Sequence, residues 1–127
     1  NPLTASRQVV FCDWAEDKVQ EVLDAFQLEY GVPVLFEPYA SQEQLIEELK
    51  TGKRCDVIVM DNQLVPQLIE QRLLAELDLQ RILNYTYLSH NFVDKSFDPG
   101  NRYSLPYTWG TFGLIVKTDP GRGEVAK

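Results

Sequence analysis

Residues 97–117 have the sequence FDPGNRYSLPYTWGTFGLIVK. The residues Asp-Pro-Gly-Asn at positions 98–101 predict a tight turn, because proline fixes its φ angle and glycine and asparagine tolerate positive φ. Tyrosine, threonine and tryptophan side chains then make the middle of the stretch both aromatic and polar. Residues 112–116 are apolar apart from one glycine, a pattern typical of a strand. The stretch therefore predicts a turn and a loop that lead into a strand.

The chain before this stretch alternates between short apolar runs and longer amphipathic segments. The apolar runs predict strands at residues 8–12, 32–36 and 56–60. The amphipathic segments predict helices at about residues 17–30, 41–52 and 64–72. Strands that alternate with helices are typical of a parallel sheet with right-handed crossovers. The sequence therefore predicts an α/β fold, a parallel sheet with flanking helices, followed by a surface segment and a loop.

Polar residues, glycine and proline mark the ends of these elements. Two pairs have the spacing of a capping box, in which side chains bind backbone N–H groups of the first helical turn: Asp17 with Gln20, and Ser41 with Gln44. Gly31 predicts the end of the first helix because glycine readily adopts the left-handed conformation found there. Pro33, near the start of the second strand, predicts that this strand lies at an edge of the sheet.

The chain has 127 residues, enough for one domain, and a formal net charge of −7. Such a charge opposes nucleic-acid binding, which needs clustered Lys and Arg, and mildly favours a positively charged partner through long-range attraction. No run of about 18 apolar residues is present, so no membrane-spanning helix is predicted. With a single histidine in the chain, no metal site is expected, and no cofactor is expected either.

The two cysteines of the chain are Cys12 and Cys55. On the predicted strands Cys12 lies near the end of the first and Cys55 at the start of the third, which separates them by roughly 10–13 Å along the sheet. A disulfide needs Cα atoms within about 7 Å of each other. We therefore expect two free, mostly buried thiols.

Polar and aromatic side chains follow the first and third predicted strands. Asp13-Trp14 come after the first, and Asp61-Asn62-Gln63 after the third. Ligands of open parallel sheets bind beyond the carboxyl ends of the strands, so two carboxylates and an indole should converge at one edge. There Trp14 could contact a cation or an alkyl chain, or pack against the first helix. Asp61 could accept hydrogen bonds from an ammonium group, cap the following helix, or do both.

Two of these motifs resemble those of one known family. The stretch that starts at Phe97 closely resembles the Phe-Asp-Pro-Gly-Asn-Arg-Tyr-Ser, Pro-Tyr and Trp-Gly-Thr segments of the spermidine/putrescine-binding proteins of ABC importers. Residues 13–17 resemble the family's Asn-Trp-Thr/Ser-Asp/Glu-Tyr motif, and the resemblance covers roughly residues 9–118. It implies a periplasmic-binding-protein type II-like lobe in a receptor that closes on a polyamine without catalysis. It also implies a permease as partner and a periplasmic or extracellular location, with or without a lipid anchor.

The resemblance assigns ligand binding to five positions. Three follow the first strand and two follow the third: Trp14, Ala15 and Asp17, and Asp61 and Gln63. Only Trp14 keeps the family's residue type. A hydroxyl is lost at position 15 and aromatic rings at positions 17 and 63, while carboxylates appear at positions 17 and 61. A polyamine or another cationic small molecule is therefore the expected ligand, although the spacing of Asp17 also fits a helix cap.

The chain is less than half as long as such receptors. We therefore expect residues 1–117 to be the opening segment of a first lobe, and residues 118–127 to be a hinge crossing or a tail. On this interpretation the chain is a fragment without its second lobe and without the segment that completes its sheet. A sheet that lacks a strand exposes unpaired backbone groups, so self-association through that edge is expected.

Two other functions are compatible with the sequence. The same lobe could be a ligand-sensing module fused to a permease, a receptor or a regulator. The chain could also be a small α/β enzyme that uses Cys12 or the carboxylates. Nothing near Cys12 in the sequence is a base that would activate a thiol, and the G-x-S-x-G motif of many hydrolases is absent, so we expect no catalytic residue.

Overall fold

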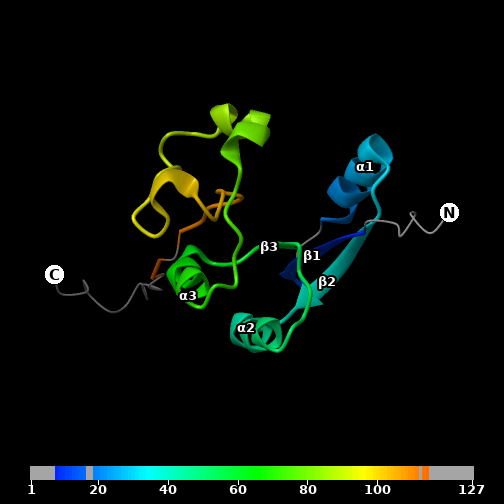
Figure 1. Ribbon diagram of the computed structural model, residues 1–127, viewed down its shortest axis with the longest axis horizontal. Coiled ribbons are helices and arrows are strands. Elements are labelled where there is room, and N and C mark those ends of the chain that lie inside the picture. Colours follow the sequence, from blue (N-terminus) through cyan, green and yellow to red (C-terminus); the bar gives the residue numbers. More distant parts are fainter. Residues whose placement is uncertain (1–7, 17–18, 112, 115–127) are drawn as a thin grey trace, which may run out of the picture.

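The computed structural model describes residues 8–16, 19–111 and 113–114. Within them the sheet contains the strands β1 (Val9–Trp14), β2 (Val34–Tyr39) and β3 (Val57–Ile58), in the order β2-β1-β3 (Figure 1). Both outer strands pair with β1 in parallel, so that Phe11 of β1 lies between Phe36 and Val57. The predicted parallel α/β fold is therefore confirmed, and the second strand lies at an edge, as Pro33 predicted.

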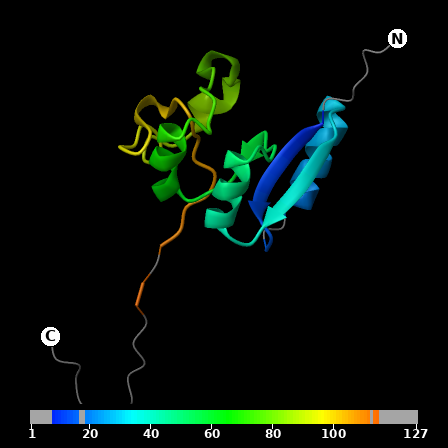
Figure 2. The same ribbon diagram turned by 60° about the horizontal axis from the view of Figure 1, so that its bottom comes forward.

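Two helices, α1 (Gln20–Tyr30) and α2 (Gln42–Lys50), cover opposite faces of the sheet (Figure 2). The chain steps from β1 to β2 in one direction and crosses back over β1 to reach β3, and right-handed crossovers then place the two helices on opposite faces. A short helix, α3 (Val65–Glu70), follows β3, and 3-10 turns follow at residues 79–81, 83–87 and 99–101. Among the described residues, no helix is long and apolar enough to cross a membrane.

The structure corrects the bounds of all three predicted strands. β1 runs from Val9 to Trp14, so Asp13 and Trp14 belong to the strand and do not follow it. β2 runs on to Tyr39, beyond the predicted end at residue 36, and includes Pro38. A proline is tolerated there because an edge strand leaves one side of its backbone unpaired. β3 is shorter than the predicted 56–60, because the chain bends at Asp56 and only Val57 and Ile58 pair as strand residues.

Glycine and serine mark helix ends as predicted. Gly31 follows α1 with a φ of 65°, and its N–H donates to the carbonyl oxygen of Gln27. At the start of α2, Ser41 Oγ accepts a 3.3 Å hydrogen bond from the N–H of Gln44. The other half of this predicted capping box is wrong, because the Gln44 side chain donates instead to Glu48 Oε1, one turn further along.

Several predictions fall on residues outside the described ranges. One is Asp17, predicted both as a helix cap and as a ligand contact; α1 begins only at Gln20, after Val19, whose side chain makes no cap. Residues 118–127, predicted as a hinge crossing or tail, are also outside. Of the strand predicted at residues 112–116, only Gly113 and Leu114 are described, and they have no regular secondary structure.

The core lies between the sheet and α2. Val10 and Cys12 of β1, Tyr39 of β2 and Leu45 of α2 are buried together, and Trp14 packs against them from a partly buried position. Fully burying a large apolar side chain contributes about 1.5–3 kcal/mol, so this cluster is the main attachment of α2 to the sheet. It also fixes one side of the edge at which the strands end.

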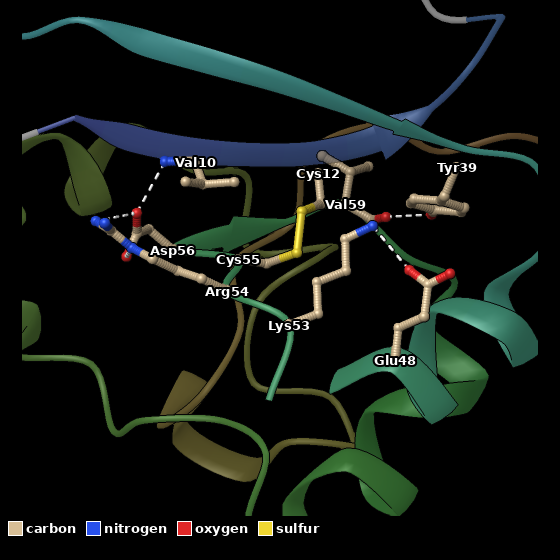
Figure 3. The surroundings of a disulfide bond; sticks show 9 residues. All are labelled: Val10, Cys12, Tyr39, Glu48, Lys53, Arg54, Cys55, Asp56 and Val59. Atoms are coloured by element: carbon tan, nitrogen blue, oxygen red, sulfur yellow. Dashed lines mark hydrogen bonds and ion pairs between the residues drawn. A yellow bond between two sulfur atoms is a disulfide. The ribbon is translucent and has the colours of Figure 1, made fainter. Parts of the chain in front are cut away.

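Cys12 and Cys55 form a disulfide, so the prediction of two free thiols is wrong. Their Cα atoms are 6.0 Å apart, well below the separation expected for a straight strand. The bend at Asp56 is the reason, because it folds Cys55 back across β1, where the Cys12 side chain is fully buried (Figure 3). The disulfide therefore links β1 to the segment that leads into β3.

Asp56 extends the short pairing between β1 and β3. Its N–H donates to the carbonyl oxygen of Val10 at 2.8 Å, and its Oδ2 accepts from the N–H of Val10, also at 2.8 Å (Figure 3). This hydrogen bond from Val10, and after it the bond from the Arg54 guanidinium, lower the pKa of the Asp56 carboxyl below its ordinary value. The charged form of Asp56 thus favours the folded chain.

We expect Asp56 to make stability depend on pH in acid. Its pKa is lower in the folded chain than the ordinary value of 3.8. Its contribution is therefore present above about pH 4 and is lost as the pH falls through the folded pKa. In Asp56→Asn, denaturation curves recorded across this range should show a smaller loss of stability than in the wild-type chain. Arg54→Gln should keep most of the wild-type dependence, because the backbone bond remains; an unaltered dependence in Asp56→Asn would contradict the prediction.

The turn predicted at residues 98–101 is confirmed. Gly100 and Asn101 have positive φ angles of 74° and 50°. Asp98, which is only 2% exposed, accepts hydrogen bonds through one oxygen from the N–H of Tyr103 and from the N–H and Oγ of Ser104. Asn101 is buried as well, and its amide oxygen accepts two hydrogen bonds from the preceding loop. Two buried polar side chains therefore organise the turn from inside.

Candidate ligand-binding edge

The carboxyl ends of the three strands meet at one edge of the sheet, where ligands of parallel sheets bind. β1 ends there at Trp14, β2 ends at Tyr39, and the segment after β3 leads to Asp61. The Tyr39 hydroxyl donates to the carbonyl oxygen of Val59, which ties the end of β2 to the segment after β3 (Figure 3). The structure thus brings the predicted Trp14 and Asp61 to the same edge.

Trp14 is partly buried and partly accessible. Its ring lies 4.9 Å from the Tyr39 ring at an interplanar angle of 46°, and it packs against the core cluster below α2. The N–H of the next residue, Ala15, donates to the carbonyl oxygen of Tyr39 at 3.0 Å, which fixes the chain as it leaves β1. Trp14 thus contacts Tyr39 of β2 and the core cluster that includes Leu45 of α2. The interpretation that Trp14 packs against the first helix is therefore wrong. An indole held in this way keeps some of its surface available for a cation or an alkyl chain.

Asp61 is exposed, and the first residue of α2 holds it at two points. Gln42 Nε2 donates to Asp61 Oδ2 at 2.9 Å, and the N–H of Asp61 donates to Gln42 Oε1 at 2.8 Å. Asp61 also precedes the 3-10 turn Asn62–Leu64, but its side chain makes no capping hydrogen bond there. The interpretation of its carboxylate as a helix cap is therefore wrong, because the carboxylate binds the side chain of Gln42 instead.

The other residues predicted near this edge differ in their exposure. Ala15 and Gln63 are exposed. Asp13 is fully buried, and its Oδ1 accepts from the N–H of Trp14 at 2.7 Å, so it shapes the end of β1 instead of facing solvent. Of the two carboxylates expected at this edge, only that of Asp61 is accessible to a ligand.

Sequence analysis missed Tyr39 and Gln42 as residues of this edge. Trp14 and Asp61 were found by the rule that ligands bind beyond the carboxyl ends of strands. The same rule applies to Tyr39 and Gln42. It did not select them because the second strand was predicted to end at residue 36, whereas it ends at Tyr39. A Tyr followed closely by a capping Ser and a Gln is the signal that could have identified them.

The aromatic part of the stretch after residue 97 lies elsewhere. Phe92 and Trp109 stack with their ring centroids 5.7 Å apart. They contribute to a hollow of about 140 Å³, lined by Leu88, Ser89, Phe92, Pro106, Tyr107, Thr108 and Trp109. None of the residues predicted to bind ligand lines it, so this part of the motif does not belong to the strand edge.

The edge holds groups that can bind a ligand. Cys12 is bonded to Cys55 and has no thiol to act as a nucleophile, which removes the thiol enzyme considered from the sequence. Within the described residues, no group of three or more His, Cys, Asp or Glu side chains could hold a metal ion. What remains is an accessible carboxylate and an indole, the two groups that attract an organic cation.

No model of a protein family matches the chain, but individual proteins do. The spermidine/putrescine-binding periplasmic protein of Escherichia coli strain K12 is 31% identical over 111 residues, which cover 86% of this chain and 32% of that protein. The putrescine/agmatine-binding protein of Pseudomonas aeruginosa is 34% identical over 121 residues, which cover 93% of this chain and 33% of that protein. The chain thus spans about a third of the length of the curated relatives it matches.

Solved structures agree with the sequence matches. The spermidine/putrescine ABC transporter substrate-binding protein PotD of Streptococcus pneumoniae superposes with a TM-score of 0.76 at 29% identity, over 80% of this chain and 32% of that chain. The resemblance seen in the sequence motifs is confirmed, and the fold is that of a fragment of a type II periplasmic-binding protein.

Proposed function

We propose that the chain is part of the substrate-binding protein of an ABC importer and contributes the strand edge on which a polyamine such as spermidine or putrescine binds. The observation that supports this most is the placement of a partly exposed indole, Trp14 backed by Tyr39, at the same edge as the exposed carboxylate of Asp61. Relatives that match the chain over about a third of their own length carry names of polyamine-binding proteins.

The proposed binding uses charge and an aromatic surface without any chemical step. An ammonium group donates hydrogen bonds to the Asp61 carboxylate, worth about 1.5–3 kcal/mol each, and its neighbouring methylene groups lie on the Trp14 ring, where a cation contributes about 0.5–2 kcal/mol. The net charge of −7 raises the local concentration of polyamines. Association costs at least about 4 kcal/mol, so these contacts alone give a Kd of roughly a millimolar or weaker.

The proposal also covers the lobes, the membrane partner and the location of such a receptor. Residues 1–117 would form the opening segment of the first lobe, and residues 118–127 would lead to a second lobe that closes on the ligand. A membrane permease would receive the ligand, in the periplasm or outside the cell, with or without a lipid anchor. The Cys12–Cys55 disulfide supports such a location, because disulfides persist in oxidising compartments. The free edge of β3 would pair with another segment, or with a second copy of the chain.

Putrescine should bind the chain weakly and at Trp14. In a ¹H–¹⁵N NMR titration into the tens of millimolar, the indole N–H signal of Trp14 should move, and its Kd should be in the millimolar range. Trp14→Ala should weaken putrescine binding about tenfold, which corresponds to the upper part of the range of interaction energies between a cation and an indole ring.

Trp109 provides the matched control, because it is the chain's other tryptophan, is 72% exposed and lines the separate hollow. Its indole signal should stay in place, and Trp109→Ala should bind putrescine like the wild-type chain. Equal movement of both indole signals, or none at Trp14, would refute the proposed site. A micromolar Kd would refute the need for a second lobe.

A further inference from the structure

The side-chain amide of Gln42 makes two hydrogen bonds, both with Asp61. Its Nε2 donates to Asp61 Oδ2 at 2.9 Å while its Oε1 accepts from the N–H of Asp61 at 2.8 Å. The residue is 9% exposed although it is polar and occupies the first position of α2. A buried amide with both groups satisfied has one orientation only, because turning it over would place Oε1 against the Asp61 carboxylate.

The two oxygens of the Asp61 carboxylate consequently differ in their hydrogen bonding. Oδ2 is occupied by Gln42, whereas Oδ1 accepts no hydrogen bond from any residue that the structure describes. An exposed carboxylate would normally rotate among several side-chain conformers, and fixing such a side chain costs conformational entropy. In this chain the fixing is done before any ligand arrives.

We propose that Gln42 is a positioning residue for amine binding: it holds the Asp61 carboxylate so that one oxygen is kept for a single ammonium group of the ligand. The inference rests on the proposed function and adds to it a residue that no motif pointed to. It also makes the start of α2 part of the binding edge, because Gln42 is the first residue of that helix. Leu45 of the same helix is anchored in the core.

A purely structural role for Gln42 makes different predictions. If the pair only fastened α2 to the strand end, its loss would lower stability but leave the affinity of the folded chain for amines unaltered. The core contacts of α2, which include the buried Leu45 and Ile46, keep the helix in place when the pair is lost. Gln42→Met keeps the length of the side chain and removes both hydrogen-bonding groups, so it separates the two roles.

The test is a double-mutant cycle with putrescine as the probe, followed by NMR at Trp14. Gln42→Met should weaken putrescine binding roughly fivefold, which corresponds to a typical interaction energy between two contacting residues. In the Asp61→Asn background the same substitution should have no further effect. Gln44→Met is the matched control: it is the same replacement on the same helix, but the Gln44 side chain binds Glu48, and putrescine binding should be unaffected.

A second measurement needs no ligand. Hydrogen exchange of the Asp61 N–H should become faster in Gln42→Met and stay at the wild-type rate in Gln44→Met, because Gln42 Oε1 is the acceptor of that N–H. Unaltered exchange, or equal putrescine affinity of wild-type and Gln42→Met, would overturn the inference while the proposed function stands. If putrescine moves no signal at Trp14 in the wild-type chain, the proposed function fails and the inference falls with it.

Discussion

Loss of the Cys12–Cys55 disulfide is expected to lower the free energy of unfolding by about 4 kcal/mol. The two cysteines are 43 residues apart in the sequence. In the loop-entropy account, a cross-link over a loop of this length lowers the conformational entropy of the unfolded chain and so stabilises the fold by about 4 kcal/mol. Domains of this size are stable by only about 5–15 kcal/mol in total, so the loss removes a large share.

The surroundings of the disulfide explain why no other contact replaces it. β3 has only two paired residues, and the segment before it is held by a few polar contacts (Figure 3). Lys53 Nζ forms a 2.7 Å ion pair with Glu48 on α2, and Asp56 binds the backbone of Val10. Partly exposed ion pairs contribute about 0–1 kcal/mol, so the covalent link is the strongest attachment of β3 to the sheet.

Chemical denaturation checks this prediction in two independent ways. The wild-type chain is compared with and without a reducing agent, and with the double variant Cys12→Ala/Cys55→Ala. Both the reduced chain and the variant should unfold at lower denaturant than the oxidised chain. The reducing agent should have no effect on the variant, which serves as the control because the chain has no other cysteine. Equal stability of oxidised and reduced wild-type chains would contradict the prediction.

The disulfide also illustrates where sequence reasoning about the fold stops. The apolar runs and helical spacing predicted the element order and the parallel sheet, because local periodicity carries that information. The bend at Asp56 depends on a contact with Val10, 46 residues away in sequence. No local pattern reports such a contact, so the strand was predicted too long and the distance between the cysteines too great.

The candidate site was predictable to a similar extent. Trp14 and Asp61 follow from one topological rule, and the structure places both at the expected edge. The role of Gln42 was not predictable, because it arises from a pairing between the start of α2 and the segment after β3. Asp13 was misjudged because β1 runs on to Trp14, beyond the apolar run, so that Asp13 lies inside the strand and is buried next to Cys12.

Asp98 carries the other large expected effect: Asp98→Ala should lower the free energy of unfolding by about 2–4 kcal/mol. Its Oδ2 accepts three hydrogen bonds, at 3.0 Å from the N–H of Tyr103 and at 2.8 and 2.7 Å from the N–H and Oγ of Ser104. Removing the carboxylate leaves all three donors without their acceptor in a region where Asp98 itself is 2% exposed. Asp98→Asn should lose less, because its amide oxygen can still accept.

Asp24→Ala is the matched control, because Asp24 is exposed on α1 and, among the described residues, its side chain binds only that of Gln20. Its stability should stay within about 0.5 kcal/mol of the wild-type value. Hydrogen exchange of the Ser104 N–H should become faster in Asp98→Ala and not in Asp24→Ala; equal stability of the two variants would contradict the prediction. Asp98 belongs to the most specific motif of the sequence, yet its hydrogen bonds stay within its own loop. Within the motif, Asp98 therefore acts by holding this loop together.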